Sequence, residues 1–64
     1  MEIGRNIARI RSGQGVTQRE LSKKVGVSRG YLARIETEKE RISLRLLARI
    51  AVALGVGIDD LIEG

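Results

Sequence analysis

The chain contains no cysteine, histidine, proline, phenylalanine or tryptophan, and Tyr31 is its only aromatic residue. Without cysteine it can form neither disulfides nor thiolate metal sites, and without histidine it lacks the commonest metal ligand and general base. Asp59 and Asp60 are adjacent, and neighbours on a helix diverge by about 100°, so they do not form a catalytic pair. We therefore expect no enzymatic activity, no catalytic residue, no metal, no cofactor and no small-molecule ligand.

Long apolar runs are also missing. No stretch approaches the ~20 apolar residues that a membrane span requires, and we expect no signal peptide. Its 64 residues predict one domain spanning 1–64, which we expect to be cytoplasmic and without a membrane partner. A chain this short buries only about 60% of its unfolded surface, so pairing with a second copy would add stability.

What the chain does contain is an excess of positive charge. Twelve Lys and Arg residues stand against eight Asp and Glu residues, which gives a net charge of +4. A small basic domain indicates an anionic partner, nucleic acid first. Single-strand and RNA binders usually stack bases on several aromatic rings, and this chain has one, so duplex DNA is favoured.

Apolar residues recur at helical spacing in five segments, and no alternation persists long enough for a strand. The sequence therefore predicts an all-α fold of five helices. Their inward faces are expected to carry Ile3, Ile7 and Ile10, then Leu21 and Val25, then Leu32 and Ile35, then Leu44, Leu47, Ile50, Ala51 and Leu54, and last Ile58, Leu61 and Ile62.

Capping residues mark the ends of these helices. Residues 17–20 (Thr-Gln-Arg-Glu) form a capping box, in which the Thr17 hydroxyl and the Glu20 carboxylate each accept from the other's backbone N–H. Ser28 and Ser43 stand where the third and fourth helices need N-caps, and Gly26 is placed to end the second helix. Two short helices joined by residues 26–28 match the helix-turn-helix motif.

The segments 17–22 (Thr-Gln-Arg-Glu-Leu-Ser), 25–28 (Val-Gly-Val-Ser) and 51–56 (Ala-Val-Ala-Leu-Gly-Val) occur with Leu32, Ile35-Glu36 and Ser43-Leu44 between them. In these motifs and their spacing the chain, from Ile3 to Ile62, resembles the lambda-repressor-like (Cro/CI, XRE) helix-turn-helix family. The resemblance implies a compact five-helix DNA-binding domain whose helix-turn-helix is formed by helices 2 and 3. It also implies transcriptional regulation, with repression favoured, by a homodimer on double-stranded DNA.

The resemblance assigns base contacts to the exposed start of the third helix, at Arg29, Gly30 and Arg34, with Tyr31 beside them. Arg29 can place its guanidinium on guanine O6 and N7; a phosphate contact and a solvated side chain are the alternatives. For Arg34, a base contact and a phosphate contact are equal alternatives. Gly30 either allows close approach to DNA or is simply tolerated in a first helical turn, and Tyr31 either contacts DNA or covers the turn between helices 2 and 3.

Phosphate contacts are implied for Gln18, at the start of the second helix, and for Ser28. Lys39 and Arg41 could add further phosphate contacts from the connector before the fourth helix, although Glu38 and Glu40 dilute its charge. The remaining arginines outside the motif are interpreted as solvated helix faces: Arg5, Arg9, Arg45 and Arg49.

The resemblance also pairs Arg11 with Glu36 as a structural ion pair. Three positions depart from the family pattern: Glu38 stands where glycine is usual, Ile42 where proline is usual, and Val52 where a polar residue is usual.

The last helix and its approach carry more apolar residues than one small core needs. The candidates for a two-fold dimer contact are Val52, Val56, Ile58, Leu61 and Ile62, with core packing as the alternative for Ile58 and Leu61. Two other functions stay open on the same fold. A protein-interaction module would bind DNA weakly and would not need Arg29, and an engineered scaffold would have no specific DNA target.

Overall fold

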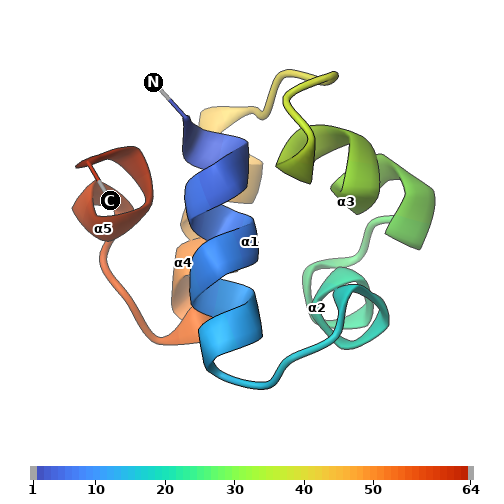
Figure 1. Ribbon diagram of the computed structural model, residues 1–64, viewed down its shortest axis with the longest axis horizontal. Helices are drawn as coiled ribbons and strands as arrows, with labels where there is room; N and C mark the ends of the chain where they lie inside the picture. The colour runs from blue at the N-terminus through green and yellow to red at the C-terminus, as the bar shows by residue number, and fades with distance from the viewer. Residues whose placement is uncertain (1, 64) are drawn as a thin grey trace.

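The computed structural model describes residues 2–63, which form five α-helices and no strand. The helices are α1 (Ile3–Gly13), α2 (Gln18–Val25), α3 (Arg29–Glu36), α4 (Leu44–Leu54) and α5 (Ile58–Glu63). The prediction of an all-α, five-helix fold is therefore confirmed for this part of the chain (Figure 1). None of these helices is long and apolar enough to cross a membrane.

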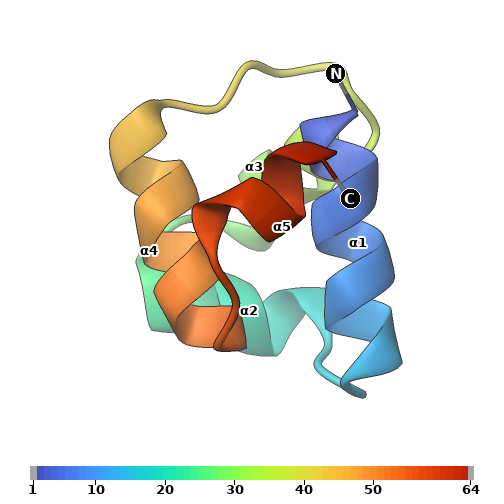
Figure 2. The same cartoon turned by 90° about the vertical axis from the view of Figure 1, so that its left-hand side faces the viewer.

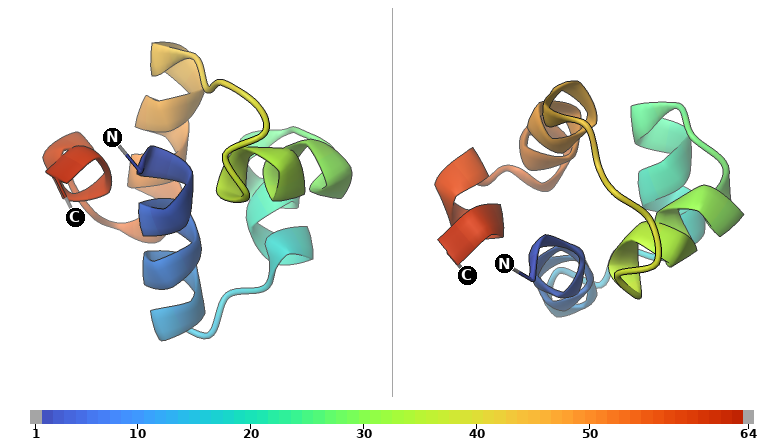
Figure 3. Two further views of the ribbon diagram at one scale, coloured as in Figure 1. Left: turned by 45° about the horizontal axis from the view of Figure 1, so that its top comes forward. Right: turned by 90° about the horizontal axis from the view of Figure 1, so that it is seen from above.

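The helices are arranged around α1, which has α5 on one side and the α2–α3 pair on the other (Figure 1). α1 packs against α3, α4 and α5, while α2 packs against α3 and α4. In Figure 2, α5 lies between α4 and α1, and the view from above in Figure 3 places α2 and α3 on the side away from α5. One face of α3 is consequently left without a covering helix.

The core is aliphatic and draws on every helix. Ile7, Leu21, Leu32, Ile50 and Leu61 come from α1 to α5 in that order, and each is 0% exposed. Burying one such side chain contributes about 1.5–3 kcal/mol relative to leaving it in water, so no helix is dispensable. The other buried apolar residues are Val25, Ile35, Leu46, Leu47, Ala51 and Leu54.

The predicted inward face of α4 was wrong at its first residue. Leu44 is 72% exposed, whereas Leu46 is 6% exposed and lies in the core. Helical periodicity grouped Leu44 with Leu47, but Leu44 stands in the first turn, beside the exposed connector, where no neighbouring helix covers it. Leu46 instead extends the buried face on the side of Ile50, one turn further along α4.

The N-terminal caps agree with the prediction. Thr17 Oγ1 accepts from the Glu20 N–H at 3.0 Å, and the Glu20 carboxylate accepts from the Thr17 N–H at 2.8 Å, which confirms the capping box. The bond from the Thr17 N–H, then the Thr17 hydroxyl, and last the Lys24 charge hold the pKa of Glu20 below its ordinary value. The Ser28 and Ser43 hydroxyls cap α3 and α4 in the same way.

Four helices end in one type of turn, in which a backbone N–H donates to the carbonyl five residues earlier. Three of these turns use glycine for the left-handed residue that the turn requires, at Gly15, Gly26 and Gly55, with φ of 73°, 79° and 69°. At the end of α3 the same position holds Glu38, with φ of 64°. The bonds are Val16 to Arg11, Val27 to Ser22, Lys39 to Arg34 and Val56 to Ala51.

Glu38 therefore occupies the position where the family pattern has glycine. A left-handed conformation costs a residue with a Cβ roughly 1–2 kcal/mol. The Glu38 carboxylate accepts from the backbone N–H of Arg5 at 2.9 Å. That N–H lies in the first turn of α1, where N–H groups lack intrahelical partners and the helix dipole favours a negative charge. The bond to α1 offsets the strain at Glu38.

α1 approaches the end of α3 most closely at Gly4. A Cβ placed on Gly4 would lie 1.9 Å from the carbonyl oxygen of Ile35 and 3.0 Å from Glu38 Oε2. Since the first distance is far inside van der Waals contact, the packing of α1 on α3 requires glycine at this position. Nothing in the sequence around Gly4 indicates this role, because the need for glycine arises from contact with Ile35 on α3.

Candidate nucleic-acid interface

The turn that joins α2 and α3 is held by its own residues and by a side chain of α4. Gly26 ends α2 in the left-handed conformation, and Ser28 caps α3. The Arg49 guanidinium on α4 donates to the carbonyl of Val25, the last residue of α2. Arg49 is exposed, as the sequence predicts, but its guanidinium is not only solvated. It neutralises the negative end of α2 and ties the helix-turn-helix to α4.

α3 buries one face and exposes the other. Leu32, Ile35 and Glu36 are buried, whereas Arg29, Gly30 and Arg34 are exposed, and Tyr31 is half-buried against the core. We name the surface formed by Arg29, Gly30, Tyr31 and Arg34 the α3 outer face. The structure thus brings the residues predicted to contact bases onto one uncovered surface of a single helix.

Arg34 has two partners on this surface. Its guanidinium carbon lies 5.7 Å from the centroid of the Tyr31 ring, within the range of a cation–π interaction. Its Nε lies 3.5 Å from Glu40 Oε1, on the connector that follows α3. From the sequence, Glu40 was predicted only to dilute the charge of Lys39 and Arg41, because nothing in the local pattern shows that the connector turns back toward Arg34.

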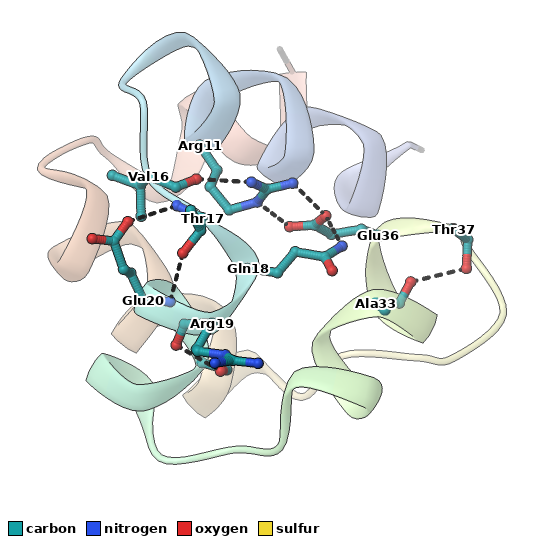
Figure 4. Close-up of polar contacts among 10 residues, drawn as sticks. Arg11, Val16, Thr17, Gln18, Arg19, Glu20, Ala33, Glu36 and Thr37 are labelled. Atoms are coloured by element: carbon teal, nitrogen blue, oxygen red, sulfur yellow. Dashed lines mark hydrogen bonds and ion pairs between the residues drawn. The ribbon is translucent and has the colours of Figure 1, made fainter.

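A polar network centred on the buried Glu36 joins the end of α3 to α1 and α2 (Figure 4). Arg11 donates to both oxygens of Glu36, from Nε at 2.7 Å and from Nη2 at 2.9 Å, and its Nη1 donates to the Val16 carbonyl at 2.8 Å. The two side chains are 13% and 4% exposed, so the pair is largely shielded from water. The structure therefore joins the two residues that the resemblance paired.

Gln18 belongs to the same network, which sequence analysis did not foresee. Its Nε2 donates to Glu36 Oε1 at 2.8 Å (Figure 4). A primary amide carries two N–H donors and an accepting oxygen, so Gln18 keeps one donor for a further partner. The bond to Glu36 fixes the side chain at the start of α2, beside the N–H groups that this helix end leaves unpaired.

The sequence model of the helix-turn-helix family matches residues 7–61 of this chain. The chain belongs to the helix-turn-helix family. An immunity repressor protein of Bacillus phage phi105 is 37% identical over 62 residues, which cover 97% of this chain and 43% of the repressor. The resemblance to lambda-repressor-like domains is thereby confirmed. This helix-turn-helix domain spans less than half of the phage protein's length.

Solved structures agree with this membership. The clp gene regulator ClgR from Corynebacterium glutamicum has a TM-score of 0.94 and 35% identity, covering 97% of this chain and 66% of its own. The biofilm regulator SinR from Bacillus subtilis, solved in complex with DNA, has a TM-score of 0.86 and 31% identity, covering 94% of this chain and 97% of its own. The helix-turn-helix domain therefore has the backbone arrangement of known regulators.

The connector between α3 and α4 carries the predicted phosphate contacts Lys39 and Arg41, and both are exposed. Ile42, which replaces the usual proline, is half-buried against the core and holds the connector down before α4 begins. The backbone that carries Lys39 and Arg41 is thus anchored at both ends, by the turn at Glu38 and by the packing of Ile42.

The candidate dimer residues of the helix-turn-helix domain fall into different environments. Val52 is 82% exposed, and Val56, Ile58 and Ile62 are half-buried at the edge of the core. Leu61 is 0% exposed, so of the two alternatives given for it, core packing and a dimer contact, the structure shows core packing. Its side chain faces the interior of its own chain, where Asn6 of α1 also donates to the Leu61 carbonyl at 2.8 Å.

Proposed function

We propose that this helix-turn-helix domain binds duplex DNA sequence-specifically and regulates transcription, as a repressor in preference to an activator. The α3 outer face carries the proposal, because it is an uncovered helix surface with two exposed arginines, while Glu36, the acidic residue of α3, is buried. The names of an immunity repressor and of a regulator solved with DNA support the same function. Transcriptional regulators of this family are not enzymes.

In this proposal α3 enters the major groove and α2 lies across the phosphate backbone. Arg29 and Arg34 donate to guanine O6 and N7, the commonest specific contact of arginine. Tyr31 and Gly30 lie against the neighbouring bases, where a glycine allows the helix backbone to approach closely. The fixed turn between α2 and α3 supports this reading, because base contacts require side chains held at a defined angle to the duplex.

Phosphate contacts set the register. Gln18 donates its second amide N–H to a phosphate at the positive end of α2, while Glu36 holds the first. Ser28 donates its hydroxyl hydrogen outward, since its oxygen accepts from the Tyr31 N–H. Lys39 and Arg41 add contacts from the connector.

We also propose that residues 1–64 form one domain, that the domain is cytoplasmic, and that it acts as a homodimer on DNA. The dimer would use Val52, Val56, Ile58 and Ile62, which lie on α4, on α5 and between them. Two recognition helices related by a two-fold axis would address half-sites about 34 Å apart. The exposed Val52 supports this proposal, since an apolar side chain at 82% exposure is open to a partner.

The deciding experiment is selection of a random duplex library with the purified domain, followed by binding of the winner and of a mixed-sequence duplex at several salt concentrations. We expect a palindromic consensus. Arg29→Ala should relax the preference at one base pair of each half-site, by about 1–3 kcal/mol of discrimination. Gln18→Ala should weaken both duplexes by the same factor, because a phosphate contact carries no sequence information.

Lys23→Ala is the matched control. It removes the same charge as Arg29→Ala, from an exposed position on α2 that belongs neither to the α3 outer face nor to the proposed dimer residues. It should leave the consensus unchanged. If the library yields no consensus, or if Arg29→Ala and Lys23→Ala have equal effects, groove reading by α3 is wrong. The same result would favour a protein-interaction module on this fold.

A further inference from the structure

Glu40 lies outside the α3 outer face, yet it forms an ion pair with a residue of that surface. Arg34 is held between the Tyr31 ring and the Glu40 carboxylate. The two ends of this arrangement differ in rigidity. Tyr31 is half-buried and packed on the core, whereas the Arg34 and Glu40 side chains are 54% and 40% exposed. Tyr31 therefore provides a fixed platform, and Glu40 a partner that a ligand can displace.

The turn at the end of α3 explains why Glu40 reaches Arg34. The Lys39 N–H donates to the Arg34 carbonyl at 2.9 Å, and the Glu38 N–H donates to the Ile35 carbonyl at 3.1 Å. With Glu38 in the left-handed conformation, these bonds fold the chain back over the last turn of α3. The residue after Lys39 is thereby brought beside the side chain that leaves α3 at Arg34.

The geometry of the ion pair leaves part of the guanidinium available. Glu40 contacts Nε, and the Nη1 side extends back along α3, where it would lie 3.9 Å from a Cβ at Gly30. The Nη1 and Nη2 groups form the end of the fork that can donate to two acceptors at once. Guanine O6 and N7 are such a pair, and guanine is neutral. A phosphate also presents two oxygens to the fork, but it is an anion, so it must compete with the Glu40 carboxylate for the charge of Arg34.

We infer that Glu40 is a specificity-determining residue, which restrains Arg34 from binding phosphate in non-specific DNA and holds its fork in position for guanine. This inference rests on the proposed DNA-binding function. Glu40 touches no base itself; it acts through Arg34 and is a positioning residue. Non-specific affinity is lowered more than specific affinity, so the ratio between the two rises.

The test uses Glu40→Gln, which removes the carboxylate charge at nearly constant shape. Affinity for a mixed-sequence duplex should rise about two- to five-fold, the range expected for releasing one exposed ion pair. Its salt dependence should steepen by about 0.9 in log–log slope, the value for one added phosphate contact. Affinity for the selected site should rise less, so that the ratio of specific to non-specific affinity falls.

Two further variants isolate the cause. Glu63→Gln removes the same charge from the exposed end of α5, so it measures the effect of net charge alone. Arg34→Ala, alone and combined with Glu40→Gln, completes a double-mutant cycle. We expect the Glu40→Gln effect to shrink to that of Glu63→Gln once Arg34 is absent, and thermal melts should show all variants folded.

The inference is overturned if Glu40→Gln has the same effect with and without Arg34, or if it leaves the ratio of specific to non-specific affinity unchanged. A failure of the proposed function gives a different result. In that case the domain without substitutions selects no consensus, and Arg29→Ala changes no preference, whatever the behaviour of Glu40.

Discussion

At the scale of single residues, the molecule depends on one buried carboxylate. Glu36 sits in an otherwise aliphatic interior and is 7% exposed, but its oxygens receive donors from Arg11 and from Gln18. Burying a charge is costly unless it is paired and hydrogen-bonded. The network meets this condition and also fixes the first residue of α2 relative to the last residue of α3, the two helices of the DNA-binding motif.

We expect Arg11→Ala to lower the free energy of unfolding by about 3 kcal/mol, because it leaves Glu36 as an uncompensated buried charge. Glu36→Ala should cost a similar amount. Arg5→Ala is the control. The Arg5 side chain forms an exposed pair with Glu2, and its bond to Glu38 uses the backbone N–H, which alanine keeps, so the change should cost at most about 0.5 kcal/mol. Urea unfolding measures all three, and equal losses for Arg11→Ala and Arg5→Ala would contradict the role of the network.

Gly4 gives a second prediction at this scale. Alanine normally stabilises a helix interior by about 1 kcal/mol relative to glycine. At Gly4 the sign should reverse, with a loss of about 1–3 kcal/mol, because the added Cβ overlaps the Ile35 carbonyl. Gly13, on the same helix, has nothing within 4 Å of a Cβ, so Gly13→Ala should not destabilise. Thermal melts of both variants give the comparison. If Gly4→Ala raised the melting temperature as much as Gly13→Ala does, the close packing of α1 on α3 at Gly4 would be excluded.

At the scale of elements, local signals predicted most of the fold. Caps and glycines at Thr17, Gly26, Ser28 and Ser43 act within a few residues, so their effects could be derived from the sequence. The close approach at Gly4, the Gln18–Glu36 bond and the exposure of Leu44 could not, because each depends on how far away another helix lies. Such distances are set by the packed core as a whole.

The turn after α3 has a residue with a Cβ, Glu38, at a left-handed position where the other three turns have glycine. Glu38→Gly should be nearly neutral, because it removes both a left-handed strain of about 1–2 kcal/mol and a cap of comparable worth. Glu38→Ala keeps the strain and loses the cap, so it should be about 1 kcal/mol less stable than Glu38→Gly. Chemical denaturation can resolve this difference. If alanine were the more stable of the two, the φ of Glu38 would carry no strain.

The capping box of α2 predicts a dependence on pH. The folded-state pKa of Glu20 is lowered, mainly by the Thr17 N–H, so its contribution is present above the pKa of the unfolded chain. That contribution is lost as the pH falls through the lowered folded-state pKa. We therefore expect the stability difference between the parent and Glu20→Gln to exist at neutral pH and to vanish in acid. A difference that does not change with pH would contradict this origin.

At the scale of the whole molecule, the fold leaves unequal surfaces. α5 covers one side of α1, the α3 outer face is uncovered, and α4 exposes Val52 and Leu44 near opposite ends. A second copy could therefore bind at either of two surfaces, one at Leu44 and one at Val52. The proposed dimer uses only the surface at Val52, at the end of α4 that leads to α5.

Val52→Asp should therefore weaken binding to a two-half-site duplex by at least about ten-fold, or ~1.4 kcal/mol, while leaving binding to a single half-site unchanged. Leu44→Asp is the matched control, because Leu44 is another largely exposed apolar residue on the same helix, and it should affect binding to neither duplex. Gel-shift titrations of both duplexes give the comparison. If Leu44→Asp has the larger effect on the two-half-site duplex, the dimer surface is at the other end of α4.

The bond between Glu38 and the start of α1 has a consequence for how this family varies. The Glu38 carboxylate draws the first turn of α1 onto the end of α3, and that approach leaves no room for a side chain at Gly4. Positions 38 and 4 should therefore covary: an acid at 38 with glycine at 4, and glycine at 38 with larger residues at 4. A search pattern that insists on glycine after the third helix would pass over such members, although Glu38 adopts the same left-handed conformation that glycine adopts in the other turns.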